Sequence, residues 1–266
     1  MMNLRGAFVP FAIAGVLAAG ACGSQADGTG AAAPATTATT TKPADPKAAL
    51  AASTKELAAG NYAFKADSPI AKADGSIDAA DKSAKLLIDT AAESFKVKFE
   101  VALAGTDRWV RITTNGKSVL DRGASPDTWF HVDSTKVKKG GDLDIDLSNA
   151  DIMDVSALVD AVSDVKADGN TITGKIDGTK VDSADGFLDN DTIKDMAAAG
   201  KALPFTATLD DQGRLAELAI DAPAADSVPA GKWTFTVSGY GEQKPQTKPA
   251  GTVKEMPASS YSMLNG

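Results

Sequence analysis

Short segments in which apolar and polar residues alternate constrain the fold of this 266-residue chain more than any other feature. The clearest runs from 95 to 103, where Lys96, Lys98, Glu100 and Ala102 separate five apolar residues: Phe95, Val97, Phe99, Val101 and Leu103. Segments 205–209 and 233–238 alternate in the same way. Because successive side chains of a strand point to opposite faces, each segment predicts a strand with one dry and one wet face. Such strands are typical of antiparallel sheets that are solvated on one side.

Further segments alternate less regularly and are separated by turn residues. They are Tyr62–Ala66, Gly75–Asp78, Ala84–Thr90, Arg108–Thr113, Trp129–Asp133 and Thr171–Ile176. The sequences Asp210-Asp211-Gln212-Gly213 and Asn115-Gly116 carry residues that favour tight turns between two alternating runs. Neighbouring strands are therefore predicted to pair as hairpins.

Three segments have the pattern of helices. Lys47–Ala59 is rich in alanine and ends at Gly60, a suitable left-handed cap. Asp154–Val165 places apolar residues on one face, with Asp154 as the N-cap, and Asn190–Ala199 stops at Gly200. The apolar faces of these helices need a partner, and the dry face of the sheet is the largest one available. We therefore expect an α+β fold, a curved antiparallel half-barrel sheet with helices packed on its concave face.

The first 21 residues have the composition of an export signal. Arg5 precedes an apolar run at 7–17, which is too short to span a bilayer, and small residues follow up to Cys22. Residues 17–22, Leu-Ala-Ala-Gly-Ala-Cys, resemble the bacterial lipobox, in which small residues precede a cysteine that is lipidated. Ala19 stands where the lipobox usually has leucine, and an ordinary signal cleavage site at 19–21 is the competing interpretation. We favour lipidation, because a lone exported thiol is otherwise hard to explain.

Two other segments are predicted to lie outside the folded domain. Residues 23–46 are mainly Ala, Thr, Gly and Pro and cannot bury enough surface to offset their ordering entropy. As a coil they reach roughly 25–30 Å, either as a plain spacer or as a site of O-glycosylation. Residues 242–266 have no strong period. The expected organisation is a signal peptide at 1–21, a lipidated cysteine and tether at 22–46, a domain at 47–241 and an irregular segment at 242–266.

Composition argues against several classes of function. Cys22 is the only cysteine, so the chain has no intramolecular disulfide and no multi-cysteine metal site. A net charge of −8 argues against nucleic acid. His131, the only histidine, is interpreted as an ordinary strand residue. The acidic run at 142–147 suggests calcium, but it fails the EF-hand pattern at Leu147 and Met153, so a solvated loop is expected. We expect neither an enzyme nor a metal site.

Four segments resemble the LppX/LprAFG family of actinobacterial lipoproteins, whose fold is similar to that of the LolA/LolB carriers. They are 57–64 (LAAGNYAF), 73–78 (ADGSID), 203–215 (LPFTATLDDQGRL) and 233–241 (WTFTVSGYG). The resemblance covers about 47–240. It implies a half-barrel sheet around helices, enclosing an apolar cavity that binds the acyl chains of lipids or glycolipids. It also implies transfer of these lipids within the cell envelope.

The resemblance places the binding residues at dispersed positions of the cavity wall. The candidates are the apolar residues of inward parity: Phe95, Val97, Phe99, Val101, Leu209, Ile220, Trp233 and Phe235. With only 9 Phe, 3 Trp and 3 Tyr in the chain, a smaller or filled cavity is also consistent. The alternative function is therefore a cell-surface lipoprotein of the same fold with a filled core, which acts as an envelope interaction module without transporting lipid.

The expected partners follow from the anchor and from the resemblance. The chain is expected to be attached to the extracytoplasmic side of the cell membrane through diacylglycerol and palmitate-type acyl chains on Cys22, with no other cofactor. A lipid or glycolipid ligand and an envelope transporter are the expected partners, nucleic acid is not, and the protein is expected to be a monomer.

Overall fold

A computed structural model describes residues 45–90, 96–139, 141, 143–183, 186–224 and 229–265 of the chain. They all belong to one compact unit. The predicted signal peptide, Cys22 and the tether up to residue 44 lie outside the described residues, and so does Phe95.

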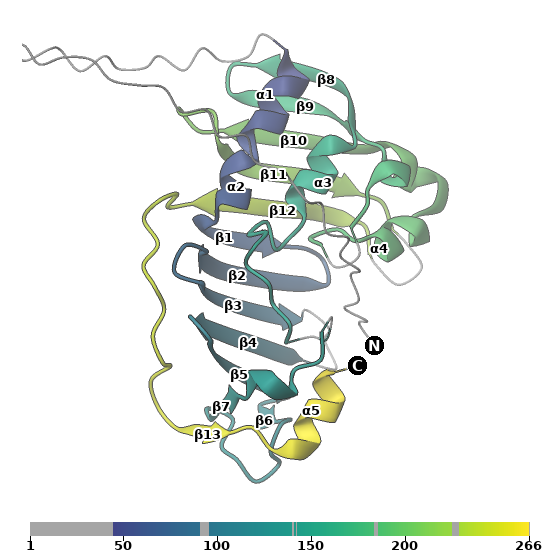
Figure 1. Ribbon diagram of the computed structural model, residues 1–266. Helices are drawn as coiled ribbons and strands as arrows, with labels where there is room; N and C mark the ends of the chain where they lie inside the picture. Colours follow the sequence, from purple (N-terminus) through teal and green to yellow (C-terminus); the bar gives the residue numbers. More distant parts are fainter. Residues whose placement is uncertain are drawn as a thin grey trace, which may run out of the picture. The chain divides into compact units, whose positions relative to one another are not determined.

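One large sheet organises the described residues (Figure 1). Its thirteen strands are β1 (Asn61–Asp67), β2 (Ala71–Asp78), β3 (Ser83–Thr90), β4 (Val97–Ala104), β5 (Asp107–Thr114), β6 (Lys117–Ser118), β7 (Trp129–Val132), β8 (Val162–Asp168), β9 (Thr171–Ile176), β10 (Leu203–Leu209), β11 (Leu215–Ala222), β12 (Gly231–Ser238) and β13 (Val253–Glu255).

The strand order is β13-β7-β5-β4-β3-β2-β1-β12-β11-β10-β9-β8, with β6 beside β5. Every pairing is antiparallel except that of β13 with β7. Two groups of strands that are neighbours in sequence, β1 to β5 and β8 to β12, form the two halves of the sheet. The halves are joined by the pairing of β1 with β12, which lies about 170 residues further along the chain. Because β8 and β13 form its two ends, the sheet is open. The predicted α+β class with a curved antiparallel sheet is confirmed.

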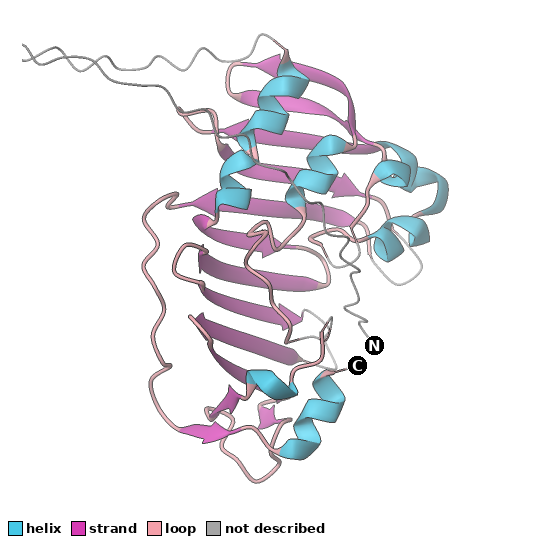
Figure 2. Cartoon of the chain, in the orientation of Figure 1, coloured by secondary structure: helices cyan, strands magenta, loops and turns pink. Residues whose placement is uncertain are grey.

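Helices lie on one face of this sheet, which we call the inner face (Figure 2). They are α1 (Pro46–Ser53), α2 (Lys55–Ala59), α3 (Val155–Asp160), α4 (Asn190–Asp195) and α5 (Ala258–Leu264), with three-residue or six-residue 3-10 turns at Ser134–Lys136, Gly178–Lys180 and Ala197–Ala202. In Figure 1 the helices α1, α2 and α3 lie in front of the strands β8 to β12 and β1.

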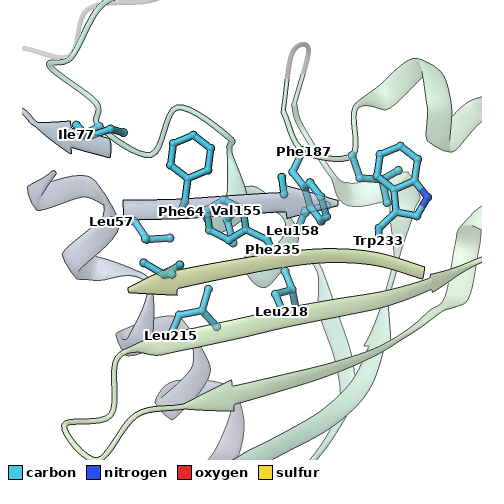
Figure 3. Packing of buried hydrophobic residues seen from close by; sticks show 14 of the residues in the cluster. Leu57, Phe64, Ile77, Val155, Leu158, Phe187, Leu215, Leu218, Trp233 and Phe235 are labelled. Atoms are coloured by element: carbon cyan, nitrogen blue, oxygen red, sulfur yellow. The ribbon is translucent and has the colours of Figure 1, made fainter. Parts of the chain in front are cut away.

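The core lies between these helices and the sheet (Figure 3). Leu57 of α2 and Leu158 of α3 belong to the same buried cluster as Leu218 of β11 and Phe235 of β12. The ring of Phe235 stacks on that of Phe64, with 5.7 Å between the centroids. The alternating apolar residues therefore provide the core, as their pattern predicts.

The predicted helix at Lys47–Ala59 agrees with the structure, whereas the one at Asn190–Ala199 is shorter than predicted. Lys47–Ala59 is confirmed as helical with a break at Thr54, and Gly60 caps it in the left-handed conformation (φ 75°). In Asn190–Ala199, α4 ends at Asp195 and the chain continues in a 3-10 turn through Gly200, so Gly200 does not stop a helix.

The prediction of a helix at Asp154–Val165 is wrong beyond Asp160. Residues from Val162 onward form β8, because two valines suit a strand and β9 is available as an antiparallel partner. Asp154 does not cap α3 with its side chain. Instead the Asp151 carboxylate accepts the backbone N–H groups of Val155 and Ser156, at 3.1 and 2.8 Å.

The prediction that 242–266 is irregular is also wrong for its second half. The strand β13 pairs with β7 and is followed by the helix α5, in which Tyr261 and Leu264 are buried. The Tyr261 hydroxyl accepts the backbone N–H of Asp133 at 2.7 Å. The folded part therefore extends beyond the predicted boundary at 241. Pairing with β7 cannot be read from local periodicity, because the two strands are more than a hundred residues apart.

Candidate functional site

Burial of the inner face changes along a single row of residues. The strand registers place in one row Phe235 of β12, Ala66 of β1, Ala73 of β2, Ile88 of β3, Phe99 of β4 and Ile112 of β5. The two ends of the row are buried, with Phe235 at 0% and Ile112 at 8% exposed, whereas Ala73, Ile88 and Phe99 are only half-buried. The cover of the inner face is therefore incomplete over β2, β3 and β4.

The elements that cover the rest of this face explain the difference. Segment 143–153 crosses from β5 to β1: the Arg108 guanidinium donates to the Leu143 carbonyl, and the Tyr62 hydroxyl donates to the Ala150 carbonyl at 2.6 Å. Burial raises the pKa of Tyr62, so this hydroxyl stays a donor at physiological pH. Both anchors lie in the row of Ile77, Ala84 and Leu103, which are buried. The opposite ends of β2 to β4 are not covered by this segment.

The half-buried side chains there form a continuous apolar surface, which we call the inner band. Its members are Ala71, Ala73, Leu86, Ile88, Val97 and Phe99. On β2 the side chains are small. Gly75 follows in the same strand, and an added Cβ there would lie 2.6 Å from the Phe64 ring. The Phe64 ring of the core therefore packs directly against the backbone of Gly75. The side chains of the inner band are still partly in contact with water, and such apolar surface favours binding of an apolar chain.

The other face of the same strands is charged. Lys72 of β2 lies opposite Asp89 of β3, which lies opposite Lys98 of β4. The Lys72 ammonium also pairs with the Asp67 carboxylate at 2.8 Å. The inner band has no charged member, so the two faces differ as the alternation predicts.

The structure divides the eight predicted wall residues into three groups. Val97 and Phe99 belong to the inner band, and Phe95 lies outside the described residues. The other five are at most 4% exposed and belong to the core: Val101, Leu209, Ile220, Trp233 and Phe235. Their role as lipid contacts stays a prediction, because no ligand contact tests it.

Four members of the inner band are absent from the predicted set. Leu86 and Ile88 lie in the alternating segment 84–90, so their parity is visible in the sequence once the pairing with β4 is known. Ala71 and Ala73 alternate with Lys72 and Asp74. That alternation is a signal, but alanine carries too little apolar surface to distinguish a binding wall from an ordinary strand.

One core candidate has an unsatisfied polar atom. The Trp233 indole Nε1 is buried and has no hydrogen-bond partner among the residues that the structure describes. The ring makes an edge contact with Phe187, with 5.7 Å between the centroids, and Figure 3 shows the nitrogen on the side of the ring turned away from Phe187. Buried N–H groups are almost always bonded to protein or water, so this donor needs an explanation.

His131 lies in β7, as predicted, on the outer face. Its Nδ1 is 3.2 Å from Glu255 and its Nε2 is 3.2 Å from Asp107. Burial lowers the pKa of His131, but the hydrogen bonds with Glu255 and Asp107 raise it by more, so the pKa lies above its usual 6.5. The arrangement links three strands at the end of the sheet.

The acidic run at 142–147 forms a loop where it is described, and its Asp146 side chain accepts the backbone N–H of Ser148 at 2.8 Å. Across the described ranges, the His, Cys, Asp and Glu side chains form no group of three suited to a metal ion. None of the helices in this part of the chain is long and apolar enough to cross a membrane.

A pocket of about 350 Å³ lies between α5 and residues 119–122. Its lining mixes charged and apolar side chains, including Asp121, Arg122 and Met263, and includes no residue of the inner band.

Similarity to known proteins is found among solved structures. No family model matches the chain, and no curated protein matches it. Among solved structures, the chain is similar to the crystal structure of the Mycobacterium tuberculosis lipoprotein LppX. The TM-score is 0.38 and the sequence identity 18%, over 74% of this chain and 97% of that chain. LppX gives its name to the family that the sequence segments resemble.

Proposed function

We propose that this protein is an exported lipoprotein, anchored to the extracytoplasmic side of the cell membrane through Cys22, that binds a lipid or glycolipid and carries it within the envelope. In this proposal the acyl chains lie against the inner band. The lipobox-like sequence at 17–22 and the polar tether support the anchor. The resemblance of four sequence segments to a lipid-carrier family supports the ligand class.

The single observation that carries the proposal is the loss of burial in the middle of the inner-face row, at Ala73, Ile88 and Phe99. Acyl chains need only an apolar surface, and each methylene removed from water contributes about 0.8 kcal/mol. Burying roughly eight methylenes would therefore contribute about 6 kcal/mol before the cost of association. No charge in the band opposes this binding.

One observation favours the alternative, an interaction module with a filled core. Five of the eight predicted wall residues are packed in the core, so their side chains offer little apolar surface to a ligand. In this alternative the inner band is a protein contact and binds no free lipid. The two functions make different predictions for lipid uptake by the purified protein.

Two neighbouring residues of β3 give a matched test. Ile88 faces inward and Leu87 faces outward, and both are half-buried. With residues 22–266 produced without acylation, we expect Ile88→Glu to weaken binding of a fluorescent fatty acid at least tenfold, because a carboxylate in contact with acyl chains loses its hydration. Leu87→Glu is expected to bind as the wild type does.

Thermal unfolding of both variants shows whether they are folded. Wild-type protein that takes up no fluorescent fatty acid, and that carries no lipid in native mass spectra after expression in a lipid-rich host, would favour the interaction module. Equal binding by the two variants would place the ligand somewhere other than the inner band.

A further inference from the structure

Trp233 is the third residue of β12, close to the start of the strand. It faces the same side of the sheet as Phe235, two residues further on, and is 4% exposed. Leaving a buried donor without a partner is unfavourable, because the donor has lost its hydrogen bonds with water. We therefore expect the Trp233 N–H to have a hydrogen-bond acceptor in the functional state of the protein.

The surroundings restrict what this acceptor can be. The ring contacts Phe187 and belongs to the apolar core cluster with Ile220 and Phe235. An anion such as phosphate would lose its hydration here, and the single neutral N–H would not compensate for that loss. A neutral oxygen attached to an apolar group fits better, because the group can enter an apolar site together with its acceptor.

We propose that the Trp233 indole N–H donates a hydrogen bond to the carbonyl oxygen of a lipid acyl ester, whose chain runs from there over the inner band. This rests on the proposed lipid-binding function and adds an orientation to it. The ester lies near the start of β12, and the chain runs from there in the direction of β4. Four strand spacings separate β12 from β4, roughly 19 Å along the sheet. A chain in one membrane leaflet spans roughly 15 Å, half the hydrocarbon thickness of a bilayer, which corresponds to about three of these spacings and reaches as far as β3.

Ester and ether lipids with the same chains isolate the carbonyl. Residues 22–266, produced without acylation, are incubated with vesicles of equimolar dipalmitoyl and dihexadecyl phosphatidylcholine, and native mass spectrometry compares the bound lipids. We expect the wild type to prefer the ester about 3- to 10-fold, the range for one hydrogen bond. Trp233→Phe keeps the ring and removes the N–H, so its preference is expected to disappear.

Trp109→Phe is the matched control. Trp109 is 5% exposed and lies in a separate small cluster with Ala102 and Trp129, so this variant is expected to keep the ester preference. Repeating the comparison with triacyl- and trialkylglycerol shows whether the ester of a phospholipid or of a neutral lipid is preferred.

The possible outcomes separate the two proposals. Equal uptake of ester and ether by the wild type, or an ester preference that survives in Trp233→Phe, would overturn the inference and leave lipid binding standing. It would mean that the indole N–H is bonded to water only. If the folded wild type takes up none of these lipids, both proposals fail.

Discussion

At the scale of single residues, protonation of His131 is expected to make the stability of the protein depend on pH. Its ring lies between the carboxylates of Asp107 on β5 and Glu255 on β13, and its pKa is raised above 6.5. A group whose pKa is higher in the folded state stabilises the fold fully below its unfolded pKa, and this contribution is lost as the pH rises through the folded value. The protein should therefore lose stability as His131 deprotonates.

We expect the unfolding temperature of the wild type to fall by about 1–3 °C more between pH 5.5 and pH 8.5 than that of His131→Gln, which cannot be protonated. The size follows from partly exposed ion pairs, which contribute about 0–1 kcal/mol. Calorimetry in buffers of equal ionic strength measures the difference. If the two proteins show the same pH dependence, the carboxylates do not stabilise the protonated ring.

At the scale of elements, the C-terminal helix α5 closes one end of the inner face. Beside the Tyr261 contact, the Ser260 hydroxyl donates to the Leu120 carbonyl at 2.8 Å, and the Asn265 side chain bonds both the Lys138 N–H and the Lys136 carbonyl. Leu264 is 4% exposed, whereas Met263, its neighbour in the helix, is 46% exposed. The helix is therefore expected to contribute to global stability.

Two alanine substitutions in α5 test this. We expect Leu264→Ala to lower the free energy of unfolding by about 2–4 kcal/mol, because it leaves a cavity in the core. Met263→Ala is expected to change it by at most about 0.5 kcal/mol. Urea denaturation followed by fluorescence measures both. A small effect of Leu264→Ala would show that α5 docks independently of the fold, as an irregular segment would.

At the scale of the whole molecule, attachment to the membrane is predicted to depend on one residue. The chain is acidic, with a net charge of −8, so electrostatic attraction to an anionic membrane surface is not expected to help. A single acyl chain binds a bilayer only marginally, and stable anchoring requires a second chain or another signal. Diacylation of Cys22 would supply both acyl chains at a single residue.

We therefore expect Cys22→Ser to move the protein from the membrane fraction to the soluble fraction, whereas Ser24→Ala leaves it in the membrane fraction. Fractionation of cells producing the full chain, followed by immunoblotting, measures the distribution. Retention of Cys22→Ser in the membrane fraction would contradict lipidation as the means of attachment.

Features that depend on neighbouring residues are predictable from this sequence. The alternation in 205–209 and 233–238 and the turn residues at 115–116 and 210–213 determine strands and hairpins, because side-chain parity and turn conformation are local properties. The left-handed cap at Gly60 is local in the same sense. The α+β class follows, since apolar faces of helices and strands must cover each other.

Only the tertiary structure decides which apolar residues are core and which stay accessible. Phe99 and Phe235 are the same type of residue and both face the inner side of the sheet, yet Phe99 is half-buried and Phe235 is fully buried. The difference arises because helices cover β12, whereas segment 143–153 crosses only one end of β2 to β4. The tertiary structure also decides that β8 replaces the predicted helix beyond Asp160 and that α5 docks on the domain. Each depends on a partner distant in sequence, whose position is set by packing and not by local pattern.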